Sequence, residues 1–362
     1  MNARLACLLF ASASLTPAIC LFFAALVGGV WSYLALFSIT VLVLAMDRSP
    51  IAAAATTQLK NWLPRVIILA HFLILPLTVW SVGRAEGGTP GQIIALLLGA
   101  GLFIGQVSNA CAHELIHRRD RLSRLLGTAI YCSILNGQHV SAHLLVHHVH
   151  AGTAKDPNSA PLGEGFWRYF LRVLVGEFKS GLHAENKRNQ GYKHRRTHPY
   201  LIYIVGAFAS IGVAFLLSGS LGVLVLIALS LHAQMQLMLS DYLQHYGLRR
   251  RLSKDGNLER MGPQHSWNAP QAYSAALMLN APLHSDHHVN PGRPFSELRH
   301  DTTTMPTLPR SVPVMGAVAL IPPLWRQIMD PRVQHYCPQG DHGNVMPPPA
   351  PDTGGTANVL SQ

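Results

Sequence analysis

The chain has 362 residues, of which 49% are apolar and only 12% are charged, yet its formal net charge is +11. A soluble domain of this length would carry about 25% charged residues, so the composition excludes an ordinary soluble protein and favours a membrane protein with basic loops. Because basic residues in such loops follow the topology of the chain, the charge does not indicate binding to nucleic acid. The twenty histidines are dispersed along the chain rather than gathered at one terminus, so they belong to the protein's own chemistry.

Six apolar segments are long enough to cross a bilayer as helices, for which about 20 residues are needed. The first two segments meet at Gly28-Gly29, which predicts a helical hairpin rather than a cleaved signal peptide. The sequence therefore predicts an all-α, polytopic membrane protein with six transmembrane helices. The approximate spans are 6–28, 29–46, 65–83, 93–112, 199–217 and 220–241.

The positions of lysine and arginine predict the orientation of these spans. If the N-terminus is cytoplasmic, only Arg84 of the 28 basic residues lies in an outside loop. An asymmetry of that size is a strong positive-inside signal. Both long polar segments and nearly all the histidines then face the cytoplasm, with only His71 and His232 inside spans. We expect a bacterial cytoplasmic (inner) membrane protein with both termini on the cytoplasmic side.

The C-terminal part predicts two further features. Segment 311–328 is apolar but is interrupted by Pro322-Pro323, and we expect an interfacial or re-entrant element there rather than a seventh span. Residues 336–362 are rich in proline and glycine, a composition that predicts a disordered tail. Residues 1–335 are then expected to form a single membrane-embedded domain.

Histidines recur with the spacing of metal ligands. Residues at i and i+4 lie on one face of a helix, so His113 and His117, at the cytoplasmic end of the fourth span, could bind one metal. Imidazole ligands suit iron, copper or zinc. The membrane beside the site would hold an apolar substrate, which implies oxidative chemistry, and redox-active iron is therefore the favoured metal. A single zinc takes about four ligands, whereas the full set of nine candidates suits two metals. The other seven are His143, His147, His148, His245, His284, His287 and His288.

Two other functions fit part of this pattern. Taken alone, residues 113–117 form the H-E-x-x-H motif of zinc metalloproteases, in which Glu114 would be the general base. A protease of that kind would not need His143 or His284. A transporter, the non-enzyme alternative, predicts histidines spread through the membrane rather than gathered at one face.

The histidine groups resemble the histidine boxes of the membrane-bound alkane 1-monooxygenases (alkane omega-hydroxylases), relatives of membrane fatty-acid desaturases and xylene monooxygenase. Residues 113–118 resemble the first box, the histidines of 143–148 have the spacing of the second, and 283–288 is close to the third. Residues 242–248, YLQHYGL, resemble a further box that separates alkane hydroxylases from desaturases. Asp241 and Gln244 stand where the family usually has Asn and Glu, and these departures bear on the substrate rather than on the metals.

This resemblance implies O2-dependent hydroxylation of a hydrophobic substrate at two iron ions held by the nine histidines. The terminal methyl group of an n-alkane is the expected target, with an alkyl-aromatic or terpene methyl group, or desaturation of a fatty acid, as alternatives. Glu114 and Asp286 are expected to orient imidazoles through the ring nitrogen that does not bind iron. Electrons would come from rubredoxin or ferredoxin with an NAD(P)H-dependent reductase. The arginines of 118–124 would either bind that acidic carrier or anchor the chain at lipid headgroups.

Overall fold

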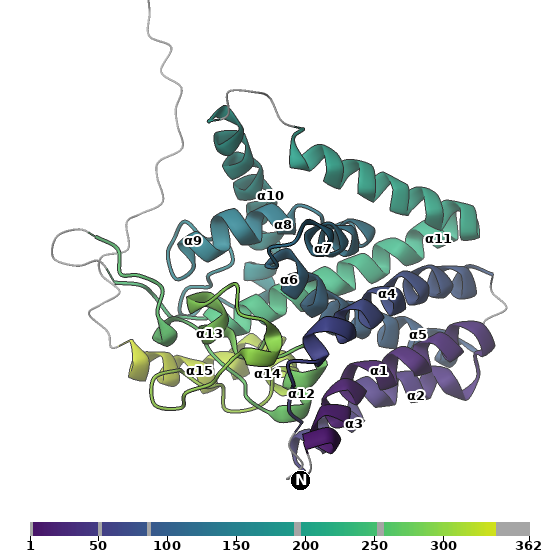
Figure 1. Cartoon of the computed structure of the whole chain (residues 1–362), viewed down its shortest axis with the longest axis horizontal. Helices are drawn as coiled ribbons and strands as arrows, with labels where there is room; N and C mark the ends of the chain where they lie inside the picture. Colours follow the sequence, from purple (N-terminus) through teal and green to yellow (C-terminus); the bar gives the residue numbers. More distant parts are fainter. Residues whose placement is uncertain (1–2, 50–52, 85–87, 192–196, 252–256, 338–362) are drawn as a thin grey trace, which may run out of the picture.

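The computed structural model describes residues 3–49, 53–84, 88–191, 197–251 and 257–337, and every named element in these ranges is a helix (Figure 1). The all-α prediction is therefore confirmed for the described part of the chain. Five helices are long and apolar enough to cross a membrane, which makes the chain a multi-pass membrane protein. They are Arg4–Val27 in α1 (Ala3–Val27), Val30–Asp47 across α2 (Val30–Ile39) and α3 (Val41–Asp47), α4 (Leu59–Gly83), Pro90–Ile116 across α5 (Pro90–Leu102), η1 (Phe103–Ser108) and α6 (Asn109–Ile116), and α11 (Pro199–His245).

The last of these helices is broken near its middle. Straight, the 47 residues of α11 would extend about 70 Å, more than twice the thickness of the hydrocarbon core. The backbone leaves the helical conformation at Ser218 and at Gly219, whose φ of 58° is readily adopted by a residue without Cβ. α11 therefore consists of two arms (Figure 1), which correspond to the predicted spans 199–217 and 220–241. The count of six spans and their orientation stay predictions.

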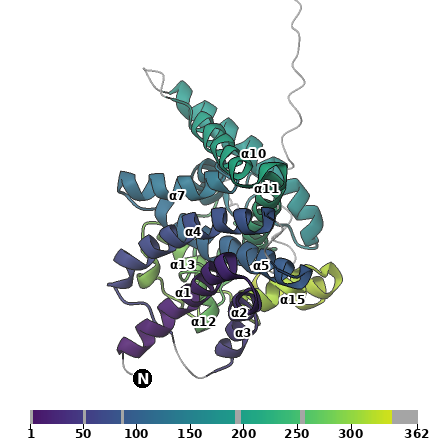
Figure 2. The ribbon, with the colours of Figure 1, turned by 90° about the vertical axis from the view of Figure 1, so that its right-hand side faces the viewer.

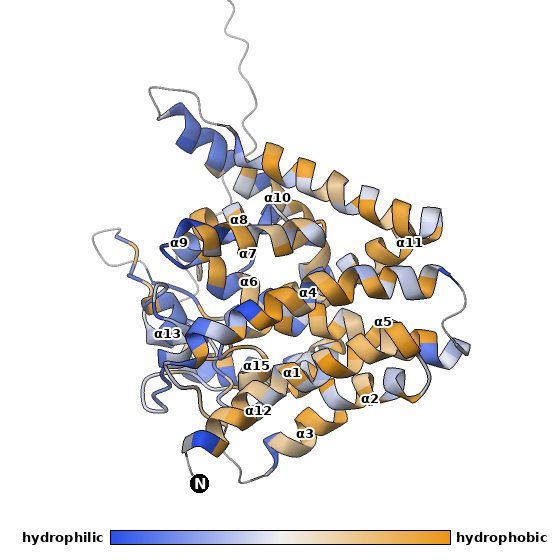
Figure 3. Ribbon diagram, turned by 45° about the vertical axis from the view of Figure 1, so that its right-hand side comes forward, coloured by the Kyte–Doolittle hydropathy of each residue, from blue (hydrophilic) through white to orange (hydrophobic). Residues whose placement is uncertain are grey.

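The spanning helices bury one side against each other and leave apolar side chains on the other. Phe10 and Leu21 of α1, Ile67 of α4 and Phe103 of η1 are almost fully buried in a common core. In contrast, Leu216 of α11 is 86% exposed. The outer surfaces of α1, α2, α4 and α11 carry many apolar residues (Figure 3). Large apolar patches of this kind mark a membrane or protein contact, and here they fit contact with lipid.

The remaining helices form a more polar region next to this bundle. Hydrophilic residues are frequent on α9, α10 and α13 (Figure 3), and α10 lies on the side of the molecule opposite α1–α3 (Figures 1 and 2). Here Phe166, Tyr242 and Trp325 share a second buried core that joins α10 and α15 to the end of α11. The elements are α7 (Arg121–Ser133), α8 (His139–Ala142), η2 (His143–His147), α9 (His148–His150), α10 (Phe166–Gln190), η3 (Pro263–His265), α12 (Ala272–Leu277), α13 (His284–Val289), η4 (Phe295–Glu297), α14 (Val312–Ala319) and α15 (Pro322–Tyr336).

The apolar segment at 311–328 forms two short helices, as its proline pair predicts. α14 ends at Ala319, the backbone is non-helical at Ile321, and Pro322 occupies the first turn of α15, where its missing N–H costs no helical hydrogen bond. Neither helix is long enough to be a seventh span. α15 includes Tyr336, the first residue of the predicted tail, and residues 338–362 lie outside the described part of the chain.

Candidate metal centre

The structure brings the nine predicted ligands together, although they come from segments up to 175 residues apart in number, as His113 and His288 show. They form two groups, and within each group one ligand atom per residue lies within 4.8 Å of all the others. We call these the five-histidine group and the four-histidine group. The five-histidine group is His113, His117, His143, His148 and His287, and the four-histidine group is His147, His245, His284 and His288.

The second sequence cluster is divided between the groups in a way that the spacing did not predict. His143 and His147 have the i/i+4 spacing, but His143 belongs to the five-histidine group and His147 to the four-histidine group. The reason is that residues 143–147 form a π-helical turn, η2. A π-turn has i→i+5 hydrogen bonds and more residues per turn than an α-helix, which brings His148 toward the face of His143, and their Nε2 atoms lie 2.9 Å apart.

The distances between imidazole nitrogens fit metal ligands. Nε2 of His143 lies 3.0 Å from Nε2 of His117, and Nε2 of His284 lies 3.0 Å from that of both His245 and His288. If two nitrogens at this separation each lay about 2.1 Å from one ion, the nitrogen–metal–nitrogen angle would be roughly 90°. In tetrahedral zinc coordination the two nitrogens would instead lie about 3.4 Å apart. The donor sets therefore fit a metal centre with right-angled ligands better than a tetrahedral zinc site.

Burial keeps most of these imidazoles uncharged. Burial, together with repulsion from neighbouring histidines, lowers the pKa of His117 to about 4. Burial, again followed by repulsion from other histidines, holds the pKa of His143, His148 and His287 well below the usual value. Neutral imidazole is the form that donates a lone pair to a metal, so the site is ready to bind one at neutral pH.

His147 differs from the others because a buried carboxylate holds its ring. Its Nδ1 lies 3.0 Å from Oδ2 of Asp156, and both side chains are buried. Burial lowers the pKa of His147, but the charge of Asp156 and this hydrogen bond outweigh burial and raise it overall. Nε2 of His147 is buried and has no hydrogen-bond partner in the part of the chain that the structure describes. That nitrogen is therefore left for a metal, an arrangement in which the carboxylate fixes the ligand.

The two carboxylates predicted to orient imidazoles have other partners. Glu114 accepts hydrogen bonds from Arg118 at 3.3 Å and from the backbone N–H of Phe295 at 3.1 Å. Asp286 forms an ion pair with Arg293 and accepts from the backbone N–H of Arg299. Neither has a ring nitrogen among its described partners, so the expected contact with an imidazole is absent there. Their bonds instead join α6 and α13 to the loop at 293–299.

Sequence reasoning assigned no role to His139, which lies beside the five-histidine group. Its side chain is buried, its ring centroid lies 5.1 Å from that of His143, and its Nδ1 lies 2.5 Å from Oε1 of Glu177. Glu177 and Glu185 are eight residues apart and therefore share one face of α10, and both are buried. The sequence feature that could have indicated a carboxylate partner for a histidine is this pair of acids on one face of an amphipathic helix.

A cavity of about 300 Å³ adjoins the five-histidine group, and His113 forms part of its wall. Most of the lining is apolar and comes from α3, α5, α11 and α14, with Leu44, Leu102 and Val312 among the residues. Its size is at the lower end of the range for small-molecule sites. The aromatic residues of the second predicted span do not line it: Phe37, for example, is 49% exposed on the outer surface.

Comparison with known proteins agrees with this geometry. The family model for fatty acid desaturases matches residues 88–318. The chain is 33% identical to alkane 1-monooxygenase 2 of Alcanivorax borkumensis over 252 residues, which cover 69% of this chain and 62% of that relative. It is 31% identical to alkane 1-monooxygenase 2 of Pseudomonas aeruginosa over 281 residues, or 75% of this chain and 74% of the relative. Identity to the xylene/toluene monooxygenase hydroxylase component of Pseudomonas putida is 28% over 283 residues, covering 76% and 73% of the two chains.

Proposed function

Because the chain belongs to the fatty acid desaturase family, and within it to the alkane 1-monooxygenases, we propose that it hydroxylates a terminal methyl group of a hydrophobic substrate. An n-alkane is the first candidate. The observation that carries this proposal is the position of the apolar cavity, whose wall includes a member of the five-histidine group. A hydrocarbon in that cavity would have its reacting carbon next to the metal centre.

The nine histidines are proposed to hold two iron ions, which would supply the redox chemistry that activates O2. In the overall reaction one oxygen atom enters a C–H bond and the other leaves as water, with two electrons and two protons taken up. The protein's own contribution is to keep most of the imidazoles neutral by burial and to orient them, as Asp156 does for His147. Orientation of this kind lowers the entropic cost of reaching the transition state.

The electrons are proposed to come from a rubredoxin or ferredoxin with its NAD(P)H-dependent reductase, on the cytoplasmic side of a bacterial inner membrane. The arginine run does not single out a docking site for this carrier. On α7, exposed Leu122 and Leu125 alternate with Arg121 and Arg124, a pattern that favours anchoring at lipid headgroups. Residues 1–335 are proposed to act as one membrane-embedded domain.

The experiment is to express the chain with a rubredoxin and its reductase, supply alkanes, alkylbenzenes and terpenes, and identify the products by mass spectrometry. A primary alcohol supports the proposal, and a double bond would instead assign a desaturase. His143→Ala and His284→Ala should each abolish activity, whereas His183→Ala, at an exposed position on α10, is the matched control. Activity that survives His143→Ala, together with one zinc and no iron per chain, would overturn the di-iron assignment in favour of the H-E-x-x-H alternative.

A further inference from the structure

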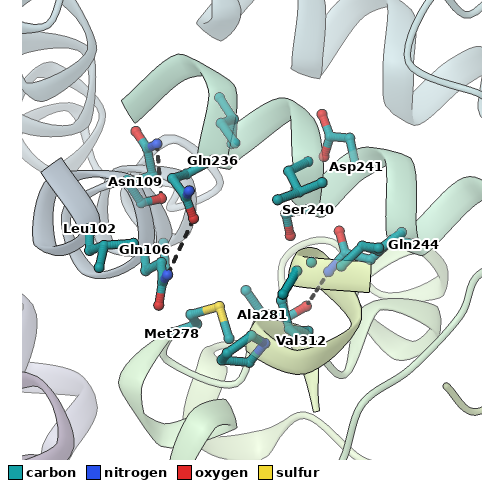
Figure 4. Close-up of a pocket in the computed structure, with 18 of the residues that line it drawn as sticks. Leu102, Gln106, Asn109, Gln236, Ser240, Asp241, Gln244, Met278, Ala281 and Val312 are labelled. Carbon is teal, nitrogen blue, oxygen red and sulfur yellow. Dashed lines mark hydrogen bonds between the residues drawn. The ribbon is translucent and has the colours of Figure 1, made fainter. Parts of the chain in front are cut away.

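The cavity beside the five-histidine group has a polar side that a hydrocarbon does not need. Gln236, Ser240 and Gln244 are spaced by four residues and therefore line one face of the second arm of α11. Across the cavity, Gln106 and Asn109 extend from the helix that carries His113 (Figure 4). Polar residues inside apolar spans are energetically costly and indicate functional sites. Two rows of them facing one cavity therefore indicate that the cavity binds a partly polar molecule.

Several of these groups have hydrogen-bonding capacity left over. Gln106 donates through Nε2 to Oε1 of Gln236 at 3.2 Å, but Oε1 of Gln106 is buried without a partner in the described residues. Asn109 uses its Nδ2 for the carbonyl oxygens of Gly105 and Ala233, which leaves its Oδ1 similarly without a partner. The unmatched atoms are acceptors, and a buried acceptor in the wall of a mostly apolar cavity requires a donor.

A saturated hydrocarbon cannot supply that donor. If it filled the cavity, it would keep water away from these acceptors, and each unpaired group would cost about tenfold to a hundredfold in affinity. A hydroxyl group would satisfy one of these acceptors, because it donates its proton to the Gln106 oxygen and accepts from a neighbouring hydroxyl or amide. Sites built to hydrogen-bond a substrate hydroxyl discriminate strongly against analogues that lack it.

We infer that the cavity takes an aliphatic alcohol, with its hydroxyl at the Gln106–Gln236 pair and Ser240 and its far methyl group toward His113. Gln106 precedes His113 by seven residues, or about 10 Å along a helix, so the hydroxyl lies several carbons from the reacting methyl group. This inference rests on the proposed function, because the second oxygen would be introduced by the same reaction. The product is a diol: O2, two electrons and two protons convert the methyl group to a primary alcohol and release water.

The test compares n-alkanes with primary alcohols of the same chain length, from octane to dodecane, as competing substrates of the metal-loaded protein in nanodiscs. We expect the alcohol to be favoured at least tenfold in kcat/KM and to give the α,ω-diol. Ser240→Ala and Gln106→Met should each reduce this preference about tenfold by slowing turnover of the alcohol alone. The matched control is Ser230→Ala, a buried serine of the same helix that does not line the cavity, and it should leave the preference unchanged.

A preference for the alkane would overturn the inference and leave the proposed function intact. So would equal losses on both substrates in Ser240→Ala and Gln106→Met, because these polar groups would then hold water rather than substrate. If neither substrate is hydroxylated, the proposed function fails. The inference is then tested separately, by comparing how well the protein binds the alcohol and the alkane. For this measurement, metal-free protein in nanodiscs is incubated with deuterated decan-1-ol or deuterated decane, and the amount retained by empty nanodiscs is subtracted. The protein should retain more of the alcohol than of the alkane, and equal retention would overturn the inference.

Discussion

Replacing Asp156 with asparagine should weaken metal binding in the four-histidine group and leave the five-histidine group loaded. In the native protein Oδ2 of Asp156 accepts from Nδ1 of His147 at 3.0 Å and from the hydroxyl of Ser159 at 2.7 Å, while Oδ1 accepts from the backbone N–H of Asn158 at 3.1 Å. All these partners are donors. An asparagine has one acceptor atom, so its NH2 group must face at least one of them.

The size of this effect can be worked from those contacts. If the NH2 group faces Asn158, the bond to His147 survives without its charge, and if it faces His147, the ring loses its only carboxylate partner. Loss of such an outer partner costs about 10- to 100-fold in metal affinity, or roughly 1.4–2.7 kcal/mol. Because His147 belongs only to the four-histidine group, the loss should be confined to one of the two ions.

The assay is metal content by mass spectrometry during titration with a chelator of known affinity. Wild-type protein should release its two ions at similar chelator concentrations, and Asp156→Asn should release one ion at a concentration about 10- to 100-fold lower. Asp301→Asn is the control, because Asp301 is an exposed carboxylate that binds only nearby turn residues. Unchanged release of both ions from Asp156→Asn, or an equal shift of both, would refute the reasoning.

Three further results are expected. Gly247→Ala should destabilise the protein by about 1–3 kcal/mol, measured by thermal unfolding in detergent, because Gly247 has a φ of +73° and an added Cβ would lie 2.6 Å from a methyl of Val333. Metal-free protein should lose stability as the pH falls from 7.5 to 5.5, because unfolded histidines bind protons near pH 6.5 while buried ones such as His117, with a pKa of about 4, do not; a flat profile would contradict this. Leu44→Trp should shorten the longest substrate accepted, since Leu44 lines the cavity, and product chain length is the measurement.

The sequence was sufficient for the features that depend on local periodicity. Apolar runs predicted the spanning helices, including the boundary inside α11, and histidine spacing selected all nine side chains that converge at the centre. The division of those side chains between two groups could not be predicted in the same way. The i/i+4 rule assumes an α-helix, and nothing in HLLVH distinguishes an α-turn from a π-turn.

The polar surroundings depend on tertiary structure, and this is why the prediction for Glu114 and Asp286 was less successful. Those two acids are neighbours of ligands in sequence, but their oxygens point to arginines and backbone N–H groups. Two acids that contact histidine rings in or beside the two groups, Asp156 and Glu177, are nine and 38 residues from their partners. The cavity likewise draws its walls from five distant segments, which no local pattern brings together.

The π-turn at η2 has a mechanical consequence for the centre. It directs two consecutive residues, His147 and His148, into different groups, so a single peptide unit, with about 3.8 Å between its Cα atoms, links the two histidine groups. The peptide bond is planar and stiff, and it acts as a covalent spacer between the two groups.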